Sequence, residues 1–185
     1  MAILDLEEQL VFYGSYHTHK HNITIHIIFV PILMFGLFLL SSSFALASNP
    51  YLNLSTLASL LYSSLYIAME PVAGSIITPY IILQSLLGTY LHLQYGNDAV
   101  YWVGVSQIVA WGIQFVGHGV FEKKAPALLD NIVQALFLAP FFVWLEVLFM
   151  WGYRPELRDR VSKKVKTRRA EMDAKKGTDG VKKEL

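Results

Sequence analysis

The chain has 185 residues, of which 54% are hydrophobic and 16% are charged, and its formal net charge is +1. Soluble domains average about 25% charged residues, whereas residues 27–121 of this chain contain only two of the Asp, Glu, Lys and Arg residues, Glu70 and Asp98. This distribution excludes an ordinary cytosolic enzyme, a disordered protein and a nucleic-acid-binding protein, and it indicates an integral membrane protein whose partner is the lipid bilayer.

Residues 3–16 are predicted to form an amphipathic helix, because apolar side chains recur there at helical spacing with acidic residues between them. We expect this helix to lie on the membrane surface or against the spans. A short polar segment, residues 17–26, follows it and contains four of the six histidines.

Four apolar stretches come next and are predicted to be full membrane spans, because about 20 apolar residues at about 1.5 Å each cross a hydrocarbon core of about 30 Å. They are residues 27–47, 52–68, 72–93 and 99–121.

The fifth apolar stretch, residues 128–151, differs because it contains Asp130, Glu146 and a central proline, Pro140. The residue before a proline avoids the α region, so the helix is expected to break there and turn back, with the two acidic side chains facing protein. The sequence therefore predicts an all-α, polytopic membrane helix bundle of four full spans plus a fifth stretch broken near Pro140.

The C-terminal segment is strongly basic. Residues 154–185 hold 12 of the 15 Lys and Arg residues, which predicts a cytosolic tail over residues 153–185 beside a membrane-embedded bundle over residues 1–152. The last four residues, Lys182–Leu185, resemble the dilysine retrieval signal of endoplasmic reticulum membrane proteins. We therefore expect a multi-pass protein of the endoplasmic reticulum membrane with an even number of crossings.

Polar side chains gather at two places near the membrane boundary. Asn22 and His26 are separated by four residues at the start of the first span, and Gln114, His118 and Glu122 are expected to share one face of the fourth helix. Because four spans return the chain to its starting side, both groups are expected on one membrane face.

A metal site is the chemistry that these residues favour. Ionisable groups at membrane depth are functional candidates, and without any cysteine a metal must be held by imidazole, carboxylate or carbonyl groups. We predict that His17, His26 and His118 hold the metal, with Glu122 as a further ligand or as a hydrogen-bond acceptor behind a histidine. The remaining histidines are expected elsewhere: His92 on the opposite face, and His19 and His21 in an exposed loop.

Three blocks of sequence carry a resemblance to a known family. The first comprises Tyr16-His17, Asn22, His26 and Pro31; the others are residues 111–123, WGIQFVGHGVFEK, and 126–140, PALLDNIVQALFLAP. Over roughly residues 3–152 the chain resembles the membrane-bound 2-hydroxy fatty acid dioxygenases.

The resemblance implies an Fe(II)-dependent enzyme that converts a long-chain 2-hydroxy fatty acid and O₂ to the fatty acid one carbon shorter, CO₂ and water. This is fatty acid α-oxidation in the endoplasmic reticulum, as in phytosphingosine breakdown. The family histidines correspond to His17, His26 and His118. For the substrate we predict contacts from Asn22 and Gln114, and from Lys123 or Lys124, which lie one turn beyond His118 where a cation can meet a carboxylate.

Two other classes stay open at this point. His17 and His21 have the spacing of part of a histidine box of the di-iron lipid hydroxylases and desaturases, although such sites need more than the six histidines of this chain. A non-enzymatic membrane scaffold or metal carrier is the third possibility.

Overall fold

The structure is a computed structural model, which describes residues 4–126, 128, 131–132 and 134–183. Its regular elements are all helices, and within these residues the only extended pairing is an isolated bridge between Ala45 and Asn53. The predicted all-α class is therefore confirmed. In chain order the elements are α1 (Leu6–Tyr16), α2 (Lys20–Ser41), α3 (Leu54–Met69), α4 (Pro71–Tyr95), α5 (Asn97–Gly117), η1 (His118–Glu122), η3 (Gln134–Leu138), α6 (Ala139–Met150) and α7 (Pro155–Lys183).

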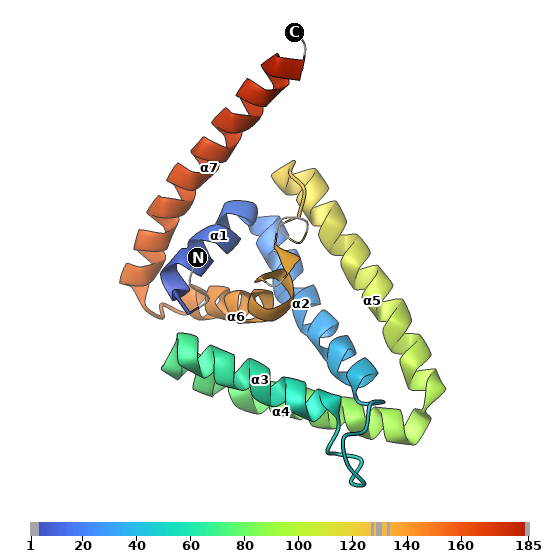
Figure 1. Ribbon diagram of the computed structural model, residues 1–185. Coiled ribbons are helices and arrows are strands. Elements are labelled where there is room, and N and C mark those ends of the chain that lie inside the picture. The colour runs from blue at the N-terminus through green and yellow to red at the C-terminus, as the bar shows by residue number, and fades with distance from the viewer. Residues whose placement is uncertain (1–3, 127, 129–130, 133, 184–185) are drawn as a thin grey trace.

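Two helix pairs form the body of the molecule (Figure 1). Helices α2 and α5 pack together and run in opposite directions, so the beginning of α2 and the end of α5 lie at the same end of the molecule. Helices α3 and α4 form the second pair, both helices of which pack against α2, and α1 lies beside α7. This arrangement brings the two polar groups of the sequence together.

The chain is a multi-pass membrane protein, because several of its helices are long and apolar enough to cross a membrane. These helices are Lys20–Ser41, Pro71–Tyr95 and Asn97–Glu122. Helix α3 has 16 residues and is about 24 Å long at about 1.5 Å per residue, which is short of a core of about 30 Å. The second predicted span is therefore a shorter apolar helix, and the described residues contain three candidate spans, or four if the bent pair below counts as one.

The fifth apolar stretch has a sharp bend, but the bend follows Met150 and does not lie at Pro140. Residues 134–150 form one helical segment, in which the π-helix η3 ends at Leu138 and α6 begins at Ala139 with Pro140 in its first turn, and this segment meets residues 155–174 at an angle of 119°. Proline is tolerated in a first turn because its missing N–H has no intrahelical partner there. Glu146 is half-buried, whereas Asp130 lies outside the described residues.

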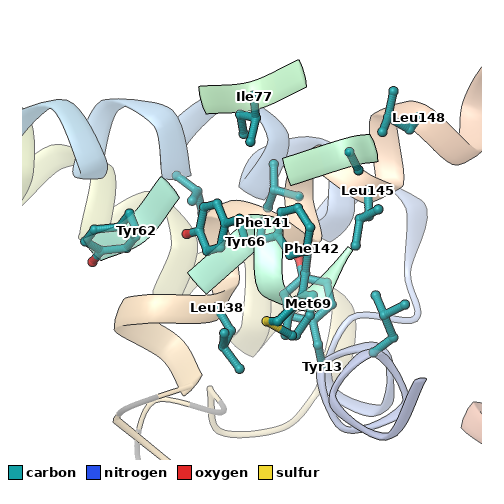
Figure 2. Close-up of a cluster of buried hydrophobic side chains, with 14 of the residues drawn as sticks. Tyr13, Tyr62, Tyr66, Met69, Ile77, Leu138, Phe141, Phe142, Leu145 and Leu148 are labelled. Atoms are coloured by element: carbon teal, nitrogen blue, oxygen red, sulfur yellow. The ribbon is translucent and has the colours of Figure 1, made fainter. Parts of the chain in front are cut away.

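Aromatic side chains from α3 support the irregular backbone of η3 (Figure 2). The Tyr62 hydroxyl donates a hydrogen bond to the carbonyl of Leu136 at 3.0 Å, and the Tyr66 hydroxyl donates to that of Phe137 at 2.8 Å. The Tyr66 ring also stacks on Phe141 at 4.5 Å between centroids, inside the buried core. Backbone that departs from the α-helix at membrane depth needs such partners, and here the protein supplies them.

Glu70, one of the two charged residues of the apolar region, ends α3 and begins α4. Its carboxylate accepts a hydrogen bond from the Ala73 amide at 2.5 Å and another from the Tyr153 hydroxyl at 2.9 Å, and Pro71 follows as the first residue of α4. This is the acidic N-cap followed by proline that favours a helix start. The helix then continues through Pro79.

Candidate metal centre

Three histidines that are far apart in the sequence meet at the end of the molecule where α2 begins and α5 ends. His17 follows the last residue of α1, His26 lies in the second turn of α2, and His118 opens η1. One nitrogen from each ring lies within 4.8 Å of the others, and the three residues are between 3% and 6% exposed. A turn between α1 and α2 is what lets His17 approach His26.

Hydrogen bonds to the backbone fix the orientation of two of the rings. Nδ1 of His17 lies 2.9 Å from the carbonyl of Tyr13, and Nδ1 of His26 lies 2.9 Å from the carbonyl of Asn22. Because a carbonyl can only accept, each Nδ1 carries the hydrogen and each Nε2 keeps its lone pair. Burial, followed by the neighbouring His26 and His118 rings, lowers the pKa of His17 well below its ordinary value, so this imidazole is neutral.

The cluster fits a divalent transition metal. Nε2 of His17 and Nδ1 of His118 are buried and have no hydrogen-bond partner within the part of the chain that the structure describes. Buried polar atoms normally have a partner, and converging imidazoles whose second nitrogens are held by carbonyls are the usual arrangement around a metal. Imidazole ligands suit zinc, copper, iron and nickel.

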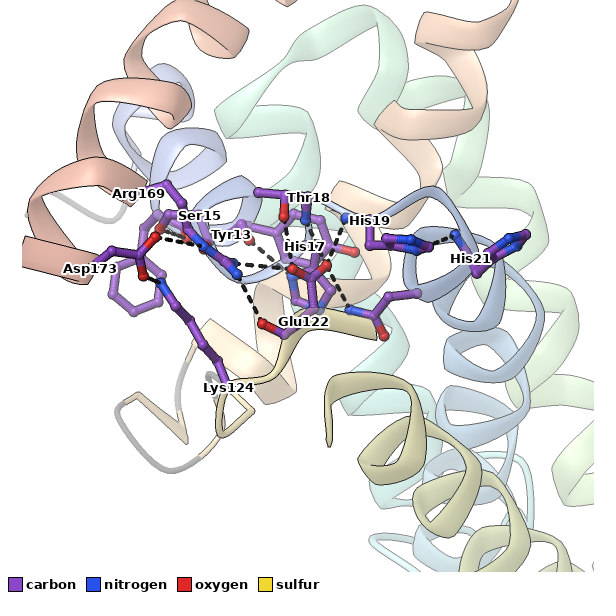
Figure 3. Close-up of polar contacts among 12 residues, drawn as sticks. Tyr13, Ser15, His17, Thr18, His19, His21, Glu122, Lys124, Arg169 and Asp173 are labelled. Carbon is purple, nitrogen blue, oxygen red and sulfur yellow. Dashed lines mark hydrogen bonds and ion pairs between the residues drawn. The ribbon is translucent and has the colours of Figure 1, made fainter. Parts of the chain in front are cut away.

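A π-helix carries the second polar group of the sequence. Helix α5 changes to η1 at His118, where Gly117 packs so closely against α2 that a Cβ atom would lie 2.7 Å from the Asn22 Oδ1 atom. Gln114, His118 and Glu122 are all buried, whereas residues 115, 116, 119 and 120 between them are exposed, as expected for one shared face. Gln114 and His118 line the interior cavity, and the carboxylate of Glu122 points to the α1–α2 turn (Figure 3).

The Glu122 carboxylate is fully engaged with the turn that carries His17 (Figure 3). Its Oε1 atom accepts from the Thr18 and His19 amides at 2.7 and 2.8 Å and from the Asn22 side chain at 3.3 Å. Its Oε2 atom accepts from the Thr18 hydroxyl at 2.8 Å and from Arg169 at 3.1 Å. Glu122 thus ties η1 to the α1–α2 turn, and it is not a member of the three-residue metal-binding group.

The two predicted lysines lie away from the cavity. Lys123 is exposed and has a left-handed backbone conformation with φ of 53°, and the buried Lys124 ammonium pairs with Asp173 at 2.5 Å. Neither lysine lines the cavity next to the histidines. A contact between these lysines and the substrate carboxylate stays a prediction, which the geometry does not favour.

The other histidines do not join the cluster. His19 stacks on Phe121 at 5.0 Å, His21 is exposed, and His92 lies near the C-terminal end of α4. Of the described histidine and acidic side chains, only those of the three-residue group converge closely enough to share an ion.

An elongated apolar cavity of about 520 Å³ starts at the histidines. It follows α2 from His26 past Met34 and Leu37 to Leu40, and the aromatic rings of Trp111 and Phe115 on α5 form the opposite wall. A volume of this size is typical of a small-molecule site.

Two polar groups face the cavity beside the histidines, and the sequence predicted only one of them. The Gln114 amide nitrogen and the Tyr13 hydroxyl are both buried without a hydrogen-bond partner among the described residues. The Tyr13 ring stacks on His17 at 4.0 Å, one helical turn earlier in α1. The spacing of four residues between Tyr13 and His17 could have indicated that the two side chains lie together. The apolar face of the predicted helix accounted for Tyr13 equally well.

Three buried imidazoles at one end of an apolar cavity, inside a bundle of membrane helices, indicate a membrane protein with a metal site and a cavity that suits a lipid-like molecule. Comparison with known proteins gives the particular family. Residues 3–151 match the family model described as 2-hydroxy-palmitic acid dioxygenase Mpo1-like. The chain is also 38% identical over 159 residues to the 2-hydroxy-palmitic acid dioxygenase MPO1 of Saccharomyces cerevisiae, which covers 85% of this chain and 87% of that protein.

The chain therefore belongs to the Mpo1-like family and is a 2-hydroxy fatty acid dioxygenase, an oxidoreductase. This confirms the family and activity expected from the sequence blocks, in preference to a di-iron hydroxylase or a scaffold. No solved structure matches the chain.

Proposed function

We propose that the chain binds one Fe(II) ion through His17, His26 and His118 and splits a long-chain 2-hydroxy fatty acid with O₂. The buried three-histidine cluster at the end of the apolar cavity is the observation that supports this proposal. Among the metals that imidazole suits, zinc has no redox chemistry. Bound iron would supply the redox chemistry that lets O₂ react with the substrate.

The reaction balances without any external reductant: RCH(OH)COOH + O₂ gives RCOOH + CO₂ + H₂O. The bond between C1 and C2 breaks, C1 leaves as CO₂, and C2 is oxidised from an alcohol to a carboxyl group while O₂ is reduced. No nucleotide cofactor is required, and we propose none.

Oxygen uptake by the purified, iron-loaded protein tests this function. With 2-hydroxypalmitate we expect O₂ consumption and the appearance of the fatty acid with 15 carbons, whereas palmitate and 3-hydroxypalmitate should give neither. Turnover of 3-hydroxypalmitate, or a hydroxylated product of unchanged chain length, would contradict the proposal.

The cavity is proposed to hold the acyl chain. The cavity-lining stretch of α2 from His26 to Leu40 covers about 21 Å at about 1.5 Å per residue, and its apolar walls suit a hydrocarbon chain that enters from the bilayer. The head of the substrate would then lie at the polar end, beside the histidines.

Leu37→Trp is expected to shorten this space. Because a lost methylene contact in a pocket is worth about 10-fold or more in kcat/KM, we expect kcat/KM for 2-hydroxypalmitate to fall at least about tenfold relative to that for 2-hydroxydecanoate. Leu83→Trp is the matched control, since Leu83 is exposed on α4 and does not line the cavity. An equal loss for both substrates in the Leu37 variant would mean that the chain does not lie along α2.

Tyr13 and Gln114 are proposed to donate hydrogen bonds to the substrate carboxylate or its 2-hydroxyl. Burial, followed by the charge of Glu146, raises the pKa of Tyr13 well above its ordinary value, so its hydroxyl remains a donor at any physiological pH. This donor faces the cavity beside the histidines, whereas the predicted lysines do not line it.

Tyr13→Phe is expected to lower kcat/KM by roughly ten- to a hundredfold, because a hydrogen bond to a charged group contributes about 1.5–3 kcal/mol. The iron content should not change, since the phenylalanine ring can still stack on His17. Tyr90→Phe, on the exposed surface of α4, is the control. Unaltered kinetics in Tyr13→Phe would exclude the hydroxyl from substrate binding.

We propose that the protein resides in the endoplasmic reticulum membrane with both termini in the cytosol. The basic tail and the lysines at 182 and 183 support this orientation. The packing of α7 against α1 also supports it, since it puts the N-terminal helix and the tail at the same end of the molecule. Glycosylation tags at the N-terminus and in the tail should both remain unmodified, and modification of one tag alone would require an odd number of crossings.

A further inference from the structure

A side chain of the C-terminal helix contacts the two segments next to the metal centre. Arg169 of α7 lies 18 residues beyond the end of the family match, in the charged segment that the sequence assigns to a cytosolic tail. Its Nη1 atom donates to the Ser15 carbonyl at 3.0 Å and to Glu122 Oε2 at 3.1 Å, and its Nη2 atom donates to the Glu122 carbonyl at 2.9 Å (Figure 3). The side chain is only 20% exposed.

These acceptors belong to two segments next to the cluster: α1, which ends directly before His17, and η1, which begins with His118. The Ser15 carbonyl is in the last turn of α1, two residues before His17, and Glu122 is the last residue of η1, which starts at His118. Carbonyls at the end of a helix lack an intrahelical partner and carry partial negative charge. A guanidinium satisfies both with a planar fork of donors, which a lysine ammonium cannot reproduce.

We infer that Arg169 is a positioning residue that holds α1 and η1 together and so sets the distance between His17 and His118, which makes α7 part of the catalytic unit. The inference rests on the proposed metal site. Glu122 also links η1 to the segment after α1, because its carboxylate accepts hydrogen bonds from the Thr18 and His19 amides. Arg169 adds a second link between η1 and α1 by binding the same carboxylate.

A purely electrostatic role for Arg169 predicts the opposite change in metal affinity when the residue is replaced, so an experiment can distinguish it from the positioning role. Arg169 and Lys124 face Glu122 and Asp173, two cations with two anions. If Arg169 acted only through its charge, its removal would leave a carboxylate unbalanced near the cluster, and a divalent cation would bind more tightly. If it positions the histidines, its removal weakens metal binding.

Titration of the purified full-length protein with Co(II), followed by the absorption of the bound ion, distinguishes these roles. For Arg169→Gln we expect the dissociation constant to rise about 10- to 100-fold, as for other residues that orient metal ligands. Arg169→Lys should lie between this variant and the wild type. The matched control is Arg160→Gln, which removes the same charge from the same pair of helices, because Arg160 pairs with Glu7 of α1 at 3.2 Å and is half exposed.

Arg160→Gln should bind Co(II) within about twofold of the wild type, since exposed ion pairs contribute little. An unchanged or lower dissociation constant for Arg169→Gln would overturn the inference, and if that variant does not accumulate, the same criterion applies to Arg169→Lys. Failure of the wild type to bind Co(II) would instead overturn the proposed metal site.

Discussion

Replacing His118 with alanine should abolish turnover of 2-hydroxypalmitate while the protein still accumulates in membranes. The imidazole is buried beside two others, with its Nδ1 atom lacking a hydrogen-bond partner among the described residues, so alanine removes one of three converging ligands. A metal contributes several kcal/mol of charge stabilisation to a reaction, and we therefore expect kcat/KM to fall at least about a thousandfold. Iron content, measured on the purified variant, should fall with it, and the same holds for His17→Ala and His26→Ala.

His21→Ala is the control for these three variants. His21 is exposed on the same polar segment and stands apart from the cluster, so its loss should leave iron content and turnover near those of the wild type. Loss of activity in this control would favour the di-iron histidine-box alternative, in which His17 and His21 act as a pair. Ordinary turnover by any of the three cluster variants would remove that residue from the proposed ligand set.

Glu122→Ala should both destabilise the fold and empty the metal centre. The Glu122 side chain is fully buried and accepts hydrogen bonds from three parts of the chain, the α1–α2 turn, α2 and α7. Removing one partner of a buried ion pair costs about 3–5 kcal/mol, so we expect the free energy of unfolding to fall by about 3 kcal/mol or more. Denaturant unfolding of the detergent-solubilised protein measures this change.

Two further variants separate the roles of Glu122. Glu7→Gln serves as the control, because Glu7 forms exposed ion pairs with Arg160 and Lys164 and should be nearly neutral for stability. Glu122→Gln keeps one carbonyl oxygen, so we expect partial stability and a weakened but measurable affinity for iron. A Glu122→Gln protein as stable as the wild type but devoid of iron would make the carboxylate a direct ligand.

The sequence predicted the histidine cluster because topology alone determines which ends of the spans meet. His26 begins the first span and His118 lies near the end of a later one, and an antiparallel α2–α5 pair brings them together. The bend at the end of the fifth apolar stretch was expected at Pro140, where the residue before a proline avoids the α region. Ala139 is helical, however, and the bend follows Met150. The prediction of the histidine cluster succeeds because it depends on chain direction alone.

The contacts of Glu122 and Arg169 could not be predicted in the same way. Helical spacing put Glu122 on the same side as Gln114 and His118, but it could not show that the carboxylate accepts hydrogen bonds from the Thr18 and His19 amides instead of joining the three histidines. The π turn η1 that carries Glu122 has no sequence signature as clear as proline. Arg169 is one of 12 basic residues in a charged segment, where composition gives each the same probability of being exposed. Only the path of α7 along α1 identifies Arg169 as the one that contacts Ser15 and Glu122 beside the metal centre.

The most direct measurement of the central claim is iron per chain, determined together with the ratio of O₂ consumed to fatty acid formed from 2-hydroxypalmitate. One iron bound by three histidines and a reaction without external reductant require one iron per chain and one O₂ for each shortened fatty acid. Two irons per chain, or O₂ uptake that depends on an added electron donor, would contradict the account and favour a di-iron hydroxylase.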